Sequence, residues 1–80
     1  MTTPPLQDHF AHCIQVLGGT TASSRRLGID ERALRRFVNG EREISPRLLN
    51  DTAEALRQLV AEATAAEEHI VTLLGASGGA

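Results

Sequence analysis

Apolar residues recur along this chain at steps of three and four, which is the spacing of one face of an α-helix. The first such run consists of Leu6, Phe10, Cys13, Ile14 and Leu17. Gly18-Gly19 interrupts it. Upstream, Thr3 precedes Pro4-Pro5, and this pair of features is typical of a helix start because threonine can cap free amides while proline loses no helical hydrogen bond there. The pattern predicts a first helix that ends before Gly18.

A second, short helix is predicted between this glycine pair and Gly28. Thr20 or Thr21 can cap its free amides, and the helical pattern continues to Leu27. Gly28 tolerates the left-handed backbone conformation that a sharp helix exit requires. We therefore expect the chain to turn at Gly28.

A third helix is predicted only a few residues later. Asp30 can accept hydrogen bonds from its first amides, and Glu31 lies in its first turn, where a negative charge is favourable. Asn39-Gly40 is a typical helix end. Two short helices joined by a tight glycine turn have the outline of a helix-turn-helix.

The longest periodic segment follows Ser45-Pro46, which repeats the signal of a cap followed by proline. Its apolar positions form a heptad-like stripe interrupted by one acid, namely Leu49, Ala53, Leu56, Val60, Ala63, Glu67, Ile70 and Leu74. The pattern leaves open whether residues 45–74 form one helix or two. We expect residues 75–80 to be a flexible tail, since they are small and glycine-rich. The fold class is thus an all-α helical bundle, with residues 1–74 as one domain.

Charge is distributed unevenly, although the formal net charge is only −2. Residues 20–47 hold seven arginines against four acidic residues, whereas residues 48–80 hold one arginine against five acidic residues. Such separation indicates a middle segment that faces an anion and an acidic remainder.

The predicted third helix concentrates this positive charge on one side. In helical geometry Leu34, Phe37 and Val38 share one face, and a second face carries Arg32, Arg35, Arg36 and Asn39. Arginine can bond both acceptors of guanine in the major groove and can also bind phosphates, so this face suits double-stranded DNA. The alternative is an ordinary solvated face supported by a Glu31–Arg35 pair.

Residues 20–40 resemble the helix-turn-helix of phage repressor and Cro-type transcription regulators. The similarity rests on a small residue in the second helix, an apolar-Gly-apolar turn, two apolar anchors and a closing Asn-Gly, which are Ser24, Leu27-Gly28-Ile29, Leu34, Phe37 and Asn39-Gly40. The resemblance extends loosely over residues 6–60 as a compact helical DNA-binding domain. It implies a sequence-specific regulator, most simply a repressor that binds a palindromic operator as a homodimer.

The resemblance also implies roles for individual residues. The residues implied to contact DNA bases are Glu31, Arg32, Arg35 and Arg36. Glu31 either accepts a hydrogen bond from the amino group of a cytosine or orients Arg35. Phosphate contacts fall to Thr20 and Asn39, although Thr20 departs from the glutamine that is frequent in the family and reaches less far. Further phosphate contacts are expected from Thr21, Arg25, Arg26, Arg42 and Arg47.

The second half of the long segment is predicted to be an interface. It extends beyond what so small a domain can cover, and it would leave an exposed apolar patch at Val60, Ala63, Ile70, Val71 and Leu74. Homodimerisation through these residues would place two reading helices about 34 Å apart on a symmetric operator. The alternative is an antitoxin-like or other protein-interaction module, whose acidic C-terminal helix holds a toxin or another regulator.

Other chemistry has little support in the sequence. Cys13 is the only cysteine, so no internal disulfide can form, and His9 with His12 falls short of the four ligands of a structural zinc site. No phosphate-binding glycine loop or nucleophile motif is present. We therefore expect neither an enzyme nor a metal or cofactor site, and the lack of a long apolar run predicts a cytoplasmic protein that does not enter a membrane.

Overall fold

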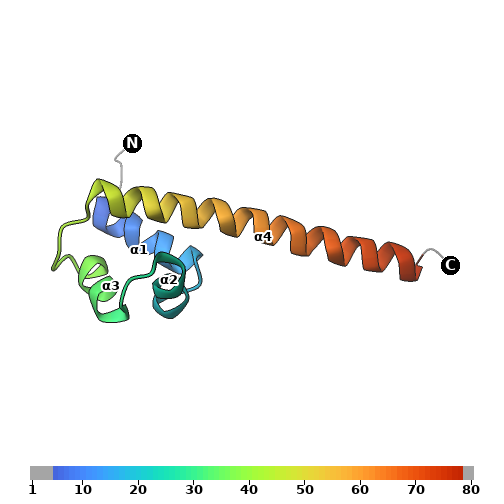
Figure 1. Ribbon diagram of the computed structural model, residues 1–80, viewed down its shortest axis with the longest axis horizontal. Helices are drawn as coiled ribbons and strands as arrows, with labels where there is room; N and C mark the ends of the chain where they lie inside the picture. The colour runs from blue at the N-terminus through green and yellow to red at the C-terminus, as the bar shows by residue number, and fades with distance from the viewer. Residues whose placement is uncertain (1–4, 79–80) are drawn as a thin grey trace.

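The computed structural model describes the backbone of residues 5–78 and the side chains of residues 5–75. It is all-α, as predicted (Figure 1). Three short helices, α1 (Leu6–Val16), α2 (Thr20–Leu27) and α3 (Glu31–Val38), pack together on the first turns of a long helix, α4 (Pro46–Gly78). α2 and α3 are joined by only three residues, 28–30.

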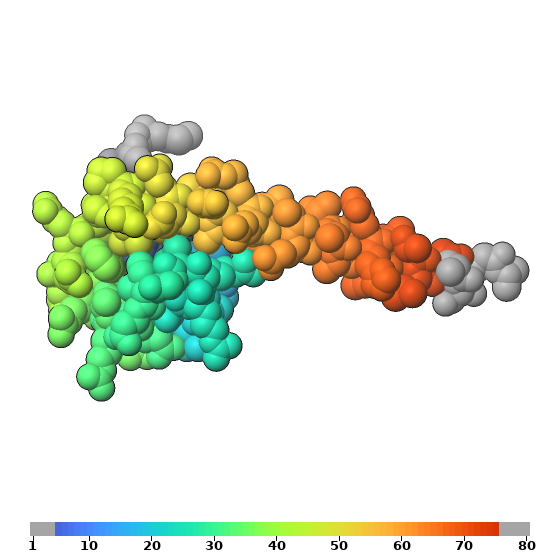
Figure 2. Space-filling view, in the orientation of Figure 1, coloured from blue at the N-terminus to red at the C-terminus, as the bar shows by residue number. Residues whose placement is uncertain are grey.

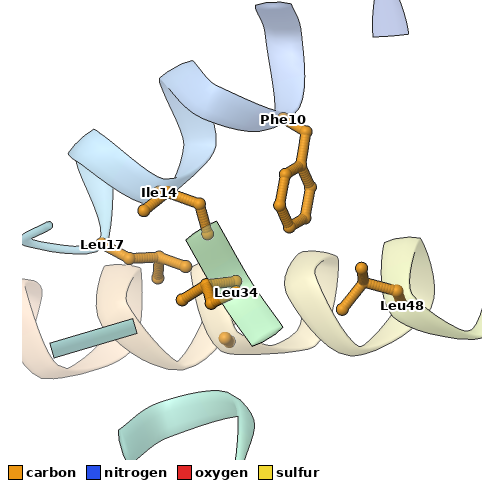
Figure 3. Packing of buried hydrophobic residues seen from close by; sticks show 6 residues of the cluster. Phe10, Ile14, Leu17, Leu34 and Leu48 are labelled. Atoms are coloured by element: carbon orange, nitrogen blue, oxygen red, sulfur yellow. The ribbon is translucent and has the colours of Figure 1, made fainter. Parts of the chain in front are cut away.

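The core lies where α1 and α3 meet the beginning of α4. Figure 3 shows Phe10 and Ile14 of α1, with Leu17 directly after this helix, directed towards Leu34 of α3 and Leu48 of α4. All five are at most 5% exposed, and Leu34 is 0% exposed. Since burying one such side chain contributes about 1.5 to 3 kcal/mol, this small cluster supplies most of the stability of the three-helix unit.

The local signals for α3 and α4 are confirmed in atomic detail. Asp30 Oδ2 accepts a hydrogen bond from the backbone amide of Arg32 at 3.0 Å, and Ser45 Oγ accepts one from the amide of Leu48 at 3.1 Å. Each cap satisfies an amide that has no partner inside its helix, which contributes about 1 kcal/mol. The caps therefore fix where α3 and α4 begin.

The predicted cap of α1 lies outside the described residues, and the predicted cap of α2 is not observed. Thr3 lies outside the described residues, and Pro5 is the residue that precedes α1. The prediction that Thr20 or Thr21 caps α2 is wrong, because Gly19 occupies the cap position with φ 96° and makes no side-chain hydrogen bond. The glycine pair turns the chain so sharply that both threonines already lie inside the helix.

Gly28 ends α2 as predicted. Its φ of 66° and ψ of 32° lie in the left-handed region, and its amide donates to the carbonyl of Ser24. No neighbouring residue in the described part of the chain would touch a Cβ here, but the left-handed backbone itself costs any residue with a Cβ about 1 to 2 kcal/mol. The turn between α2 and α3 therefore depends on a glycine at position 28.

α4 is one continuous helix, which resolves the question of one helix or two. It continues through residues 75–78, so these are helical instead of belonging to the flexible tail, while residues 79 and 80 lie outside the described part. Its core-facing side is displaced by one residue from the predicted stripe. The buried positions are Leu48, Thr52 and Ala55, whereas Leu49 and Ala53 are half-buried.

Residues 60–75 of α4 form an arm that extends away from the head, residues 5–59 (Figures 1 and 2). The molecule measures 57 × 34 × 18 Å, with a radius of gyration of 16.6 Å. A compact chain of this length has a radius of gyration of about 12 Å, and the arm accounts for the excess. None of the helices in the described part combines the length and apolar character that crossing a membrane requires.

Candidate nucleic-acid interface

The burial of Leu34 sets the orientation of α3. This side chain is fully buried, and Phe37 and Val38 pack partly buried against the same cluster. On the opposite side, Arg32, Arg35, Arg36 and Asn39 are all exposed. The two faces predicted from the spacing are therefore confirmed, and α3 presents a polar, cationic surface to solvent.

The cationic side chains of this surface have no acidic partner in the described structure. Within residues 5–75 the single ion pair joins Arg26 to Glu62, so a Glu31–Arg35 pair does not form. Asp30, at the start of the helix, accepts a hydrogen bond from the Arg32 amide and makes no ion pair with these arginines. The guanidinium groups of Arg35 and Arg36 are thus free to meet an external anion.

The segment after α3 adds one further cation near its end. Arg42 lies over the ring of Phe37, with its guanidinium carbon 5.2 Å from the ring centroid, and its backbone amide donates to the carbonyl of Arg36 at 3.3 Å. This stacking holds Arg42 beside the C-terminal end of α3 while leaving it exposed. Arg47 is also exposed, in the first turn of α4.

The predicted contact residues of α2 divide into two groups. Thr21 and Arg25 are exposed and Thr20 is half-buried, so these side chains can reach solvent. Arg26 instead turns to α4 and donates two hydrogen bonds to the carboxylate of Glu62, at 2.7 and 3.2 Å. The structure thus separates Arg26 from the other arginines and uses it to link α2 to the arm.

This pair gives a prediction about pH. The hydrogen bonds and charge of Arg26 hold the pKa of the Glu62 carboxyl below its ordinary value. The pair therefore stabilises the fold at neutral pH, and this contribution is lost as the pH falls through the lowered pKa of Glu62. In an NMR titration, Arg26→Gln should raise the pKa of Glu62 towards its ordinary value. Arg25→Gln, which removes an unpaired neighbouring charge, should change this pKa much less, and an equal change in both variants would contradict the pairing.

Two buried polar residues were missed by sequence reasoning. Ser23 is 0% exposed, and its hydroxyl donates to the carbonyl of Ile14 at 3.1 Å; Ser24, the small residue singled out in the motif, is only half-buried. Thr52 is 3% exposed and donates to the carbonyl of Leu48 at 2.7 Å. Ser23 lies four residues before Leu27 on the same helical face, and this spacing was the available signal.

The histidines and the cysteine do not form a site with other residues. The rings of His9 and His12 are 6.3 Å apart, and Cys13 is a half-buried free thiol. Among the described residues, no group of three or more His, Cys, Asp or Glu side chains is arranged to hold a metal ion.

Comparison with known proteins adds no relative. No protein-family model, curated protein or solved structure matches the chain.

Proposed function

We propose that this protein is a sequence-specific DNA-binding transcription regulator, most simply a repressor, that uses α3 to read the major groove. The observation that carries the proposal is the exposed row of Arg32, Arg35 and Arg36 on a helix whose opposite face is anchored by the buried Leu34. An exposed, rigid helix of this kind fits the width of the major groove, and its arginines match the acceptors of guanine.

The surrounding residues support a division of labour in this proposal. Base contacts are assigned to Arg32, Arg35 and Arg36 with Glu31 beside them, because base-reading side chains must project from the exposed face of the inserted helix. Phosphate contacts are assigned to residues at the rim of α3, because these fix its register on the duplex. The residues assigned to this rim are Thr20, which is half-buried, and five exposed residues, namely Thr21, Arg25, Asn39, Arg42 and Arg47.

Homodimerisation is part of the same proposal. Five large apolar side chains of the arm are more than half exposed, namely Val60, Ile70, Val71, Leu73 and Leu74. A second copy packed on this arm would double the number of reading helices and allow a symmetric operator to be recognised.

The exposed arm also favours a second candidate function. An antitoxin-like or other protein-interaction module would use the same apolar and acidic helix to hold a different protein, a toxin or another regulator. That candidate requires no base preference in α3, which is where the two proposals differ.

The deciding experiment is a selection of bound duplexes from a random DNA pool at near-physiological salt. If the protein is a sequence-specific regulator, the selection should enrich one motif. A two-fold symmetric motif would support binding as a dimer. Weak binding that falls steeply with salt and enriches no motif would contradict sequence-specific reading, because phosphate contacts alone carry no sequence information.

A further inference from the structure

We infer that a second copy of this chain covers the arm in the antiparallel direction, with the two heads at opposite ends of a two-helix pair. The inference rests on the homodimer of the proposed function and adds its direction and register. It is carried by the arm stripe, which we define as Ala63, Ala66, Ile70 and Leu73.

The arm stripe continues the face by which α4 holds the head. Leu48, Thr52 and Ala55 are buried against the head, and Leu59 packs against the same core. From Leu59, steps of four and three lead directly into the arm stripe, so both surfaces lie on one side of the helix. The arm itself, residues 60–75, is exposed along its whole length (Figure 2).

This continuity excludes a parallel pair. In a parallel pair both heads would lie at the same end and on the face through which the two helices touch. α1 and α2 of each copy would then occupy the space of the other copy's α4. An antiparallel pair places each head beyond the end of the partner's arm and avoids this clash.

The sizes of the stripe residues favour the same direction. Read along the chain, the stripe has two small residues, Ala63 and Ala66, followed by two large ones, Ile70 and Leu73. In an antiparallel pair Ala63 meets the partner's Leu73, and Ala66 meets the partner's Ile70. Every layer then joins one small and one large residue, so the helices keep a constant separation. A parallel pair would instead join small with small residues in the first two layers and large with large residues in the last two, so its separation would have to change along the arm.

The charged residues that flank the arm stripe also favour the antiparallel direction. In a parallel pair of this register, Glu62 of each copy would face the partner's Glu67, which gives two repulsive contacts. The antiparallel pair brings only the two copies of Glu67 near each other, at the two-fold axis. Glu62 stays with Arg26 of its own head.

The length of the arm fits this register. Residue 60 lies opposite the partner's residue 76, so the partner's helix pairs with the whole arm, and only its last two helical residues, 77 and 78, reach the edge of the head. The arm is about 24 Å long, which gives an interface at the small end of the range for specific complexes. We therefore expect a reversible monomer–dimer equilibrium. The heads lie about 45 Å apart along α4, so symmetric half-sites in DNA should be spaced by more than one helical turn.

Disulfide trapping tests the direction directly. In a Cys13→Ala background, Ala63→Cys and Leu73→Cys are prepared separately, mixed and oxidised. Antiparallel pairing predicts a covalent dimer in the mixture and none for Leu73→Cys alone. In the antiparallel pair the two copies of residue 73 are about 15 Å apart along the helix axis, which is beyond the reach of a disulfide. A covalent dimer formed by Leu73→Cys alone would show parallel pairing and overturn the inference.

Sedimentation with matched variants tests whether the occupant is a second copy. Ala66→Arg, at the centre of the stripe, should weaken dimerisation by about tenfold or more, since it buries an unpaired charge. Ala61→Arg makes the same change on the opposite side of the arm and should leave dimerisation intact. A wild-type protein that stays monomeric at every concentration would refute the inference. Selection from random DNA reports independently on α3, so failure of the dimer and failure of DNA reading remain distinguishable.

Discussion

Replacing Arg35 with alanine is expected to weaken binding to the selected duplex by about 1 to 3 kcal/mol, which is roughly 5- to 150-fold in affinity. Arg35 is exposed on the face of α3 opposite the buried Leu34, and no acid pairs with it within residues 5–75. A guanidinium in this position can bond both acceptors of one guanine. Its loss should therefore relax the base preference at one position of the motif, as measured by repeating the selection with the variant.

Arg57→Ala is the matched control for this prediction. Arg57 is exposed on α4 in the acidic part of the chain, so the substitution removes the same charge away from the proposed interface. It should leave both affinity and motif nearly unchanged. Asn39→Ala, at the end of α3, should weaken binding to all sequences alike, because its assigned partner is a phosphate. If Arg35→Ala also weakened binding to all sequences alike, Arg35 would not be a base-reading residue.

Replacing Leu34 with alanine is expected to cost about 2 to 5 kcal/mol of unfolding free energy, since it creates a cavity at a fully buried position. A domain of this size rarely has more than roughly 3 to 5 kcal/mol in total. We therefore expect the variant to be largely unfolded at room temperature. Urea titration followed by circular dichroism at 222 nm measures this directly.

Leu6→Ala provides the comparison for the cavity. Leu6 is 48% exposed in the first turn of α1, so the same chemical change there removes few contacts. Its unfolding midpoint should remain close to that of the wild type. A Leu34→Ala variant that unfolded at the same midpoint as Leu6→Ala would show that α3 is not held by its buried face.

The parts of the fold that could be predicted from the sequence depend on short-range signals. Asp30 and Ser45 cap their helices through residues two and three positions away, and Gly28 ends α2 through its own backbone conformation. Which side of α4 faces the core depends on long-range packing, and the predicted side was wrong by one residue along the helix. Thr52 is buried because its hydroxyl bonds to its own helix, which lets a polar residue take a core position that the apolar pattern assigned to Leu49 and Ala53.

The candidate site shows the same division. The exposure of Arg32, Arg35 and Arg36 follows from helical spacing and could be predicted. The pairing of Arg26 with Glu62 could not, because the two residues are 36 positions apart and meet only when α2 packs on α4. Charge counting placed Arg26 among the candidate phosphate contacts, whereas the fold uses it to link two helices.

The uninterrupted course of α4 has a mechanical consequence. Between Arg47 and Leu74 the helix contains neither glycine nor proline, and it passes from the core of the head into the arm without a break. The Arg26–Glu62 pair ties α2 to the helix at the point where the arm emerges. Head and arm therefore turn as one rigid lever. A partner bound at the distal end of the arm would therefore be held in a fixed orientation relative to α3.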